Sequence, residues 1–282
     1  MSGIRLRRRA LAVVTGLALT LGLVSGCAPD GQIGVNAPSQ VDSALAGDTK
    51  TQLEASVQTA MTATGSSGAI VGVWVPWAGT WVEAIGTDAD GKKLDVDVGV
   101  RVGAMTRLMT CDVLYSVVAD GIVALDDPVS KYVAGVPDLE NITLKQLCDG
   151  SSGLGTSSTI LASTWLKNPT RTWDPLELAA HGLAQARATP GSAYRDSDAG
   201  FILLGLALQR ATGDSYATLL DERVFTPLGM GNSAYPAATE LTANVGAGPM
   251  PGYVFPVTAE GALDCAAPRG MTKASASMGF SG

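Results

Sequence analysis

The fold is decided by the stretch AGFILLGLALQRATG, residues 199–213, which predicts an apolar helix. A second helical segment, LMTCDVLYSVVADG, occupies residues 108–121. The sequence between these two segments is irregular. We therefore expect a mostly helical region in the middle and later parts of the chain.

The sequence ahead of these segments predicts a β-hairpin. The run AIVGVWV (69–75) is rich in β-branched residues, PWAGT follows as a turn, and WVEAIG (81–86) returns. Residues 51–64, TQLEASVQTAMTAT, have apolar side chains at helical spacing. Strands followed by mostly helical sequence indicate an α/β (α+β) protein, in which a helical domain is inserted into a sheet domain.

Composition and charge limit the classes of protein to which the chain can belong. A chain of 282 residues with 46% hydrophobic and 16% charged residues is typical of an ordered globular protein. Loss of residues 1–26 would remove four arginines and no acidic residue, and would leave 15 basic and 26 acidic side chains, a net charge of −11. This charge argues against a nucleic-acid partner. The chain has no CxxC and no histidine cluster, so we expect no metal site and no cofactor.

The N-terminus has the pattern of an export signal. Four arginines within residues 5–9 precede an apolar run, residues 10–24, that is too short for a typical membrane-spanning helix. The run ends at Val24-Ser25-Gly26-Cys27. This ending resembles the lipobox of bacterial lipoproteins, in which the cysteine is diacylated and becomes the new N-terminus.

The lipobox resemblance implies a location as well as a modification. Residues 1–26 would be a lipoprotein signal peptide, and Cys27 would anchor an extracytoplasmic protein to the bacterial cell membrane. Residues 27–48 are polar and rich in turn formers, so they predict a flexible tether. An ordinary signal peptide, with Cys27 incidental, is the alternative interpretation.

Four phrases resemble one family in their order and spacing. They are ALDDPVSKYV (124–133), ITLKQLCDGSSGLG (142–155), ATPGSAYRDSDAGFILLG (188–205) and GDSYATLLDERVFTPLGM (213–230). They are similar to serine hydrolases of the β-lactamase and penicillin-binding-protein group, particularly class C-like and D-alanyl-D-alanine carboxypeptidase-like members. The resemblance covers residues 49–282. It implies an antiparallel sheet flanked by helices plus a helical domain, with the active site between the two.

The family's nucleophile motif lacks its reactive groups in this chain. In the family the motif runs R-x-G-S-x-x-K, and the serine is acylated while the lysine manages its proton. Here Arg101 and Gly103 are followed by Ala104, and Arg107 stands at the lysine position. A methyl group cannot be acylated, and a guanidinium does not become the neutral amine that a base requires. No serine in the chain is followed three residues later by lysine.

The family's other motifs are also altered. The glycines that flank its Y-x-N motif align with Gly191 and Gly200, which puts Asp196 at the tyrosine and Asp198 at the asparagine. Gly150 stands where the family often has a histidine. The third motif, on a strand near the family's C-terminus, falls beyond residue 282. We therefore expect a C-terminally incomplete domain that lacks the later strands.

Other side chains remain open as nucleophiles. The hydroxyl groups of Thr106 and Thr110 are candidates, but the sequence shows no base that would activate either of them. Cys111 lies seven residues after Ala104, on roughly the same side of the predicted helix. The family resemblance favours a disulfide between Cys111 and Cys148, because the family packs these two segments together. Two free thiols are the alternative.

Asp196 and Asp198 also allow more than one interpretation. In an extended segment they would point the same way, as an acid–base pair or as ligands of a cation. In the alternative interpretation, Arg107 and Arg195 simply neutralise the two carboxylates. An ion pair between Arg107 and one of these aspartates would fill the catalytic position with charge.

These observations predict a protein with the frame of a serine hydrolase and none of its catalytic residues intact. We expect a pseudoenzyme that binds a cell-envelope ligand, such as a peptidoglycan peptide or another envelope protein. The alternative is an active β-lactamase, D-Ala-D-Ala carboxypeptidase or esterase that uses a non-standard nucleophile. A remnant without function is a third interpretation.

Overall fold

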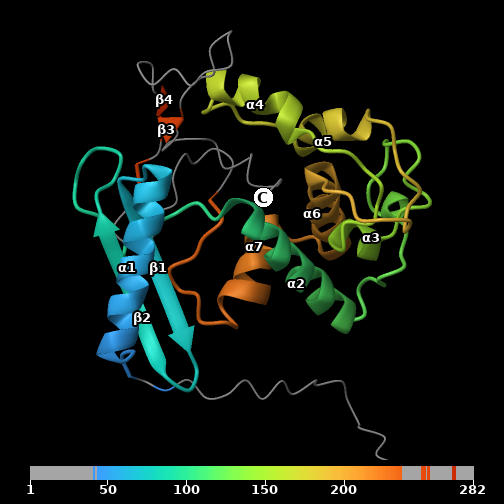
Figure 1. Ribbon diagram of the computed structural model, residues 1–282. Helices are drawn as coiled ribbons and strands as arrows, with labels where there is room; N and C mark the ends of the chain where they lie inside the picture. Colours follow the sequence, from blue (N-terminus) through green and yellow to red (C-terminus); the bar gives the residue numbers. More distant parts are fainter. Residues whose placement is uncertain (1–40, 42, 237–248, 252, 255–268, 271–282) are drawn as a thin grey trace, which may run out of the picture. The chain divides into compact units, whose positions relative to one another are not determined.

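The computed structural model describes residues 41, 43–236, 249–251, 253–254 and 269–270 (Figure 1). The expected signal peptide, the lipidation candidate Cys27 and most of the expected tether lie outside the described residues. Within the described ranges, no helix is both long enough and apolar enough to cross a membrane.

The predicted elements are present in the predicted order. The expected helices at 51–64, 108–121 and 199–213 correspond to α1, α2 and α6, and the expected hairpin is β1–β2. In chain order the elements are α1 (Gly47–Thr64), β1 (Gly68–Val75), β2 (Gly79–Gly86), the 3-10 helix η1 (Gly103–Met105), α2 (Thr106–Ala119), the 3-10 helix η2 (Val129–Lys131), α3 (Leu144–Cys148), α4 (Ser158–Lys167), α5 (Pro175–Leu183), α6 (Asp198–Thr212), α7 (Tyr216–Leu220), the π-helix η3 (Asp221–Phe225), β3 (Tyr253–Val254) and β4 (Arg269–Gly270).

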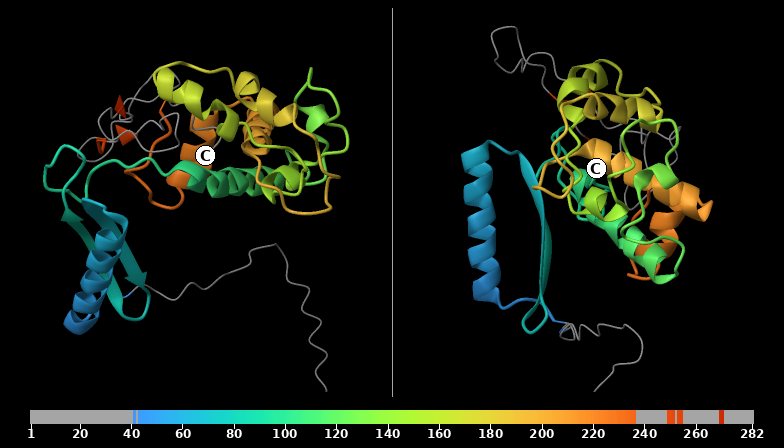
Figure 2. Two further views of the ribbon diagram at one scale, coloured as in Figure 1. Left: turned by 45° about the horizontal axis from the view of Figure 1, so that its top comes forward. Right: turned by 90° about the vertical axis from the view of Figure 1, so that its right-hand side faces the viewer.

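Within the described residues the strands form two small antiparallel sheets, β1–β2 and β3–β4 (Figure 2). Helix α1 packs on one face of the β1–β2 hairpin, where Lys50 Nζ lies 3.2 Å from Glu83 Oε2. The same carboxylate oxygen accepts a hydrogen bond of 2.8 Å from Nε1 of Trp81, whose side chain is buried. These bonds lower the pKa of Glu83, chiefly through the bond from Trp81 and next through Lys50. The helix and the hairpin are therefore joined by charge as well as by apolar contact.

The segment before α1 is already part of the folded region. The backbone N–H of Val41 donates to the Pro76 carbonyl at 2.8 Å, and that of Leu45 donates to the Thr80 carbonyl at 3.0 Å. Helix α1 then begins at Gly47. Val41 and Leu45, within the segment 27–48 that the sequence indicated as a tether, are thus bonded to the hairpin, because the hairpin edge offers backbone partners to residues of any composition.

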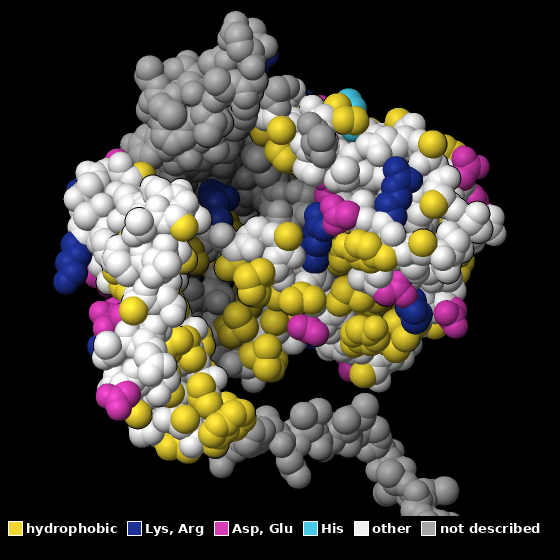
Figure 3. All heavy atoms as spheres, in the orientation of Figure 1, with side chains coloured by type: hydrophobic (Ala, Val, Ile, Leu, Met, Phe, Trp, Pro, Cys, Tyr) yellow, Lys and Arg dark blue, Asp and Glu magenta, His cyan; other side chains and the backbone are white. Residues whose placement is uncertain are grey.

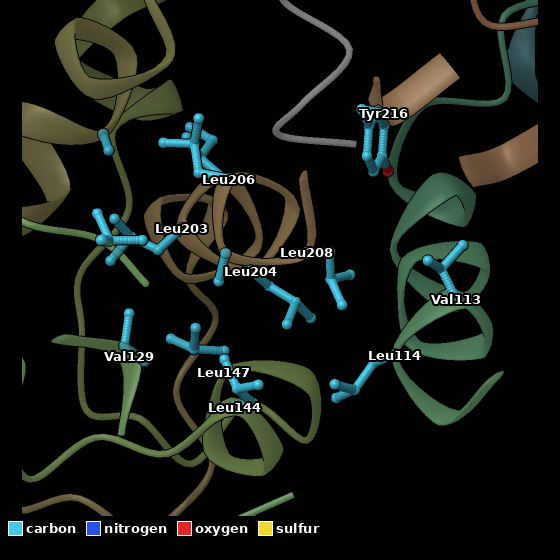
Figure 4. Close-up of a cluster of buried hydrophobic side chains, with 14 of the residues drawn as sticks. Val113, Leu114, Val129, Leu144, Leu147, Leu203, Leu204, Leu206, Leu208 and Tyr216 are labelled. Atoms are coloured by element: carbon cyan, nitrogen blue, oxygen red, sulfur yellow. The ribbon is translucent and has the colours of Figure 1, made fainter. Parts of the chain in front are cut away.

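The core of the helical region is built around α6. Every residue from Asp198 to Leu208 except Phe201 is buried, and α2, α3, α5 and α7 pack on the helix. A helix that is apolar on all sides is stable only when neighbours enclose it. Figure 4 shows how leucines of α6 meet those of the neighbouring helices; the side chains involved are Leu203, Leu204 and Leu208 of α6, Leu114 of α2, and Leu144 and Leu147 of α3.

Asp127 fixes the connection between α2 and α3. Its carboxylate accepts hydrogen bonds from the Tyr132 hydroxyl at 2.6 Å, from the Ala124 N–H at 2.9 Å and from Lys131 Nζ at 3.0 Å. These bonds lower the pKa of Asp127 to about 2, with the bond from Tyr132 as the largest cause. The carboxylate is therefore ionised in the folded protein even in mild acid.

We predict that Asp127→Asn lowers the free energy of unfolding at pH 7 by about 1–2 kcal/mol, since charge-assisted bonds are lost. The folded pKa of about 2 lies below the ordinary value of 3.8, so the stabilisation is present above about pH 4 and is lost as the pH falls toward 2. Urea unfolding at several pH values measures both effects. Asp126→Asn, at the exposed neighbouring residue, is the matched control. A difference that stays constant down to pH 2 would contradict the prediction.

Candidate functional site

Ala104 lies at the start of α2, in the 3-10 helix η1 that leads into it. The residue is exposed, and it presents only a methyl group at the position where the resemblance puts the nucleophile. Arg107 follows one turn later on α2. The position expected for the nucleophile is thus accessible but has no atom that could attack a carbonyl.

Arg107 forms an ion pair with Asp196. Its Nη1 donates to Asp196 Oδ1 at 2.6 Å, although the two residues are 89 positions apart in the chain. The Arg107 side chain is 19% exposed and that of Asp196 is 57% exposed, so solvent reaches the pair from the side of the carboxylate. The guanidinium carbon also lies 5.2 Å from the centre of the Phe201 ring, within the range of a cation–π contact. The structure therefore contains the ion pair that the sequence raised as a hypothesis.

Asp198 is fully buried and has a different role. Its two carboxylate oxygens accept from the backbone N–H groups of Ser157 and Ser158, each at 2.6 Å. Ser158 is the first residue of α4, so the carboxylate satisfies donors at a helix N-terminus from another part of the chain. Asp198 is thus a structural cap for α4.

The two aspartates do not form the carboxylate pair that their spacing suggested. Ser197 is the N-cap of α6 and Asp198 is its first helical residue, so the segment is not extended through Asp198. Asp196 faces α2, whereas Asp198 faces the start of α4. Across the part of the chain that the structure describes, no group of three or more His, Cys, Asp or Glu side chains is arranged to hold a metal ion.

Arg195 does not neutralise either aspartate through the bonds that we observe. Its guanidinium donates to the carbonyls of Gly153 and Ala186, at 3.1 and 2.6 Å, and to Gln185 Oε1 at 3.3 Å. It therefore holds together the loop before α4 and the loop before α6. No pattern in the sequence indicates this role, because carbonyl partners leave no pattern of residue types.

Ser197 is a further residue that the sequence did not single out. Its buried hydroxyl donates to the Gly155 carbonyl at 2.7 Å and accepts from the Gly200 N–H at 2.9 Å. A serine just before an apolar helix is the usual N-cap signal, so this residue could have been found from its position alone.

Tyr194 lies over Gly150. A Cβ atom at position 150 would stand 2.5 Å from Cε2 of the Tyr194 ring, which is closer than carbon atoms approach. Gly150 also has φ of +74°, a conformation that favours glycine. Position 150, where the resemblance has a histidine, thus has no room for a side chain while Tyr194 keeps this rotamer. Tyr194 itself is 73% exposed.

Two of the alternative nucleophiles, Thr110 and Cys111, are engaged in other bonds. Thr110 is 3% exposed, and its hydroxyl bonds to the Thr106 carbonyl at 2.9 Å and to the Tyr216 hydroxyl at 2.7 Å. Burial raises the pKa of Tyr216 to about 12, so the phenol is no base for Thr110 near neutral pH. Cys111 and Cys148 form a disulfide that ties α2 to α3, which leaves neither sulfur as a thiolate.

Comparison with known families identifies the family and the fold. The family profile described as Beta-lactamase matches residues 53–277. The chain belongs to the beta-lactamase family. As expected from the four phrases, the family places the helical region and the small antiparallel sheet in a β-lactamase and penicillin-binding-protein-like fold.

A curated relative and two solved structures show how far the similarity extends. The chain is 35% identical over 147 residues to the D-alanyl-D-alanine-carboxypeptidase/endopeptidase AmpH of Escherichia coli (strain K12), a match that covers 50% of this chain and 37% of AmpH. A D-stereospecific amidohydrolase from Streptomyces sp. matches with a TM-score of 0.64 at 24% identity, over 76% of this chain and 62% of that one. The octameric penicillin-binding protein homologue from Pyrococcus abyssi matches with a TM-score of 0.61 at 21% identity, over 79% and 51%. The chain thus matches only part of each of these proteins.

We predict that Asp198→Asn destabilises the protein even though it introduces the family's own residue. An amide has one acceptor oxygen, so its NH₂ group would face one of the two backbone donors at the start of α4. The free energy of unfolding should fall by about 1–3 kcal/mol. Asp196→Asn is the matched control, and because its ion pair is largely exposed we expect a loss below about 1 kcal/mol. Equal losses for the two variants, measured by urea unfolding, would contradict the role assigned to Asp198.

Proposed function

We propose that the chain is a membrane-anchored, extracytoplasmic lipoprotein of the beta-lactamase family that binds a cell-envelope ligand without forming an acyl-enzyme. The observation that carries this proposal is the Arg107–Asp196 ion pair beside Ala104. The membrane anchor rests on the apolar run and Val24-Ser25-Gly26-Cys27 at the N-terminus.

Acyl transfer needs a nucleophilic atom and a group that takes its proton. Ala104 supplies no such atom. A guanidinium does not supply the neutral amine that a base requires, and Arg107 is bonded to the carboxylate of Asp196. The first chemical step therefore lacks both its bond-forming atom and its proton acceptor.

A binding role uses the same two side chains differently. Arg107 can bind a carboxylate, and the exposed Asp196 can move aside or bind an ammonium group. AmpH is a D-alanyl-D-alanine carboxypeptidase/endopeptidase, so we propose a peptide that ends in D-alanine as the ligand. Another envelope protein is the second candidate partner.

We predict that the natural chain gives no covalent adduct with a penicillin or with a fluorophosphonate probe when intact mass is measured. Ala104→Ser/Arg107→Lys should also give none, because the new lysine would inherit the Asp196 carboxylate and remain protonated. Circular dichroism of each sample shows that it is folded. An adduct on the natural chain would instead favour an active hydrolase with a non-standard nucleophile, and mapping the adduct would identify that residue.

We further predict that Arg107→Ala weakens the binding of a peptide ending in D-Ala-D-Ala about tenfold or more, equivalent to about 1.4 kcal/mol. Calorimetric titration of the natural chain and the variant measures the difference. Arg187→Ala is the control, since Arg187 donates to the carbonyls of Pro137 and Asp138 and not to the proposed site. Failure of the natural chain to bind the peptide would remove this ligand and leave a protein partner.

A further inference from the structure

The turn end of the β1–β2 hairpin carries exposed tryptophans. Trp74 is 61% exposed and Trp77 is 77% exposed, and Val82 nearby is 47% exposed. Figure 3 shows hydrophobic side chains gathered at this end of the hairpin. By contrast Trp81 on the same hairpin is buried and bonded to Glu83. Side chains as large and apolar as Trp74 and Trp77 usually mark a contact surface when they are exposed together.

The exposed rings belong to a defined surface. The Trp74 ring lies along its strand over Gly72, where a Cβ atom would come within 2.2 Å of the ring carbon Cη2. Trp77 lies within the turn, which the Ala78 N–H closes by donating to the Val75 carbonyl at 3.0 Å. The glycine thus makes room for one ring, and the turn presents the other.

The hairpin segment that carries these rings has no charged side chain. Residues 69–82 contain no Asp, Glu, Lys or Arg. Glu83 follows directly, but it is engaged with Lys50 on the face that α1 covers. An uncharged strip rich in tryptophan has the composition of protein segments that enter the headgroup region of a bilayer, where the indole ring is apolar and its N–H finds polar partners.

The chain reaches the domain at the same place. Val41 donates to Pro76 within the turn, and Ala44 pairs with Thr80 at the start of β2. Cys27 lies 14 residues before Val41. A segment of that length spans roughly 50 Å when fully extended and about 20 Å as a flexible coil. A lipid on Cys27 would therefore hold the hairpin turn close to the bilayer surface.

We propose that Trp74 and Trp77 bind the surface of the membrane that holds the lipid on Cys27. This inference rests on the proposed membrane anchor and adds a second, non-covalent contact to it. Because the lipid raises the local concentration of the bilayer, two tryptophans suffice where they would bind only weakly alone. The contact also fixes which side of the domain faces away from the membrane. We commit to a lipid surface because the entry point of the chain lies at the tryptophans and the strip lacks charge.

The test uses the full lipidated chain in vesicles of phosphatidylethanolamine and phosphatidylglycerol whose acyl chains carry bromine, which quenches tryptophan. We expect quenching in the natural chain, strongest for bromine near the headgroups, and its loss in Trp74→Ser/Trp77→Ser. Leu108→Ser/Tyr115→Ser is the matched control, since these side chains on α2 are 68% and 50% exposed. No quenching in the natural chain, or equal quenching with and without the two tryptophans, would overturn the proposal.

A second measurement uses residues 27–282 with Cys27→Ser, which can neither be lipidated nor bind through the apolar run of residues 10–24. Sedimentation with the same vesicles should show binding that Trp74→Ser/Trp77→Ser weakens about tenfold. Binding to isolated peptidoglycan in place of vesicles would assign the tryptophans to a glycan and overturn the proposal.

The mass of the natural chain separates this inference from the proposed anchor. A diacylglycerol adduct on Cys27 without quenching leaves the anchor and removes the membrane contact. An unmodified Cys27, together with vesicle binding that depends on the tryptophans, removes the anchor and leaves the contact.

Discussion

The enclosure of α6 is the constraint on which the rest of the helical region depends. The helix is apolar on all sides, so α2, α3, α5 and α7 must pack on it together. Two close contacts constrain this packing, one on α6 itself and one between α2 and α7. Gly182 of α5 would place a Cβ atom 2.6 Å from Cβ of Ala199, and Thr110 of α2 is buried against Tyr216 of α7. The start of α6 therefore comes to a fixed place beside the start of α2, and this brings Asp196 to Arg107.

The candidate site follows from this packing and not from any local motif. Its ion pair joins Arg107 and Asp196, which lie far apart in the chain. The residues that follow and precede Asp196 bond to the loop before α4: Arg195 and Ser197 donate to carbonyls of that loop, and the buried carboxylate of Asp198 accepts from its end. The same neighbourhood supports acyl transfer in families with a serine and a lysine at its centre. In this chain its central groups are a methyl and a paired guanidinium, which is the basis of the proposed binding role.

Much of the fold was predictable from the sequence, because its signals are local. The helical spacing in residues 51–64, the β-branched hairpin and the apolar run of α6 each identify an element without knowledge of its neighbours. The Arg107–Asp196 pair was accessible as a hypothesis, because opposite charges stood at two aligned motif positions. The separation of Asp196 from Asp198 was not accessible. It depends on the residue at which α6 begins and on the backbone N–H groups at the start of α4 that need an acceptor. Neither can be inferred from the two aspartates alone.

The cap that Asp198 places on α4 has a consequence for the substitutions that the chain tolerates. Because the Asp198 carboxylate accepts hydrogen bonds from Ser157 and Ser158, a change of Asp198 alone would leave both backbone N–H groups without this acceptor. Tyr194 over Gly150 adds a second constraint, because its ring and the positive φ together make Gly150 difficult to exchange. These contacts make single substitutions at positions 198 and 150 costly to the fold. Replacement of Asp198 or Gly150 would therefore require compensating changes in the segments that contact them.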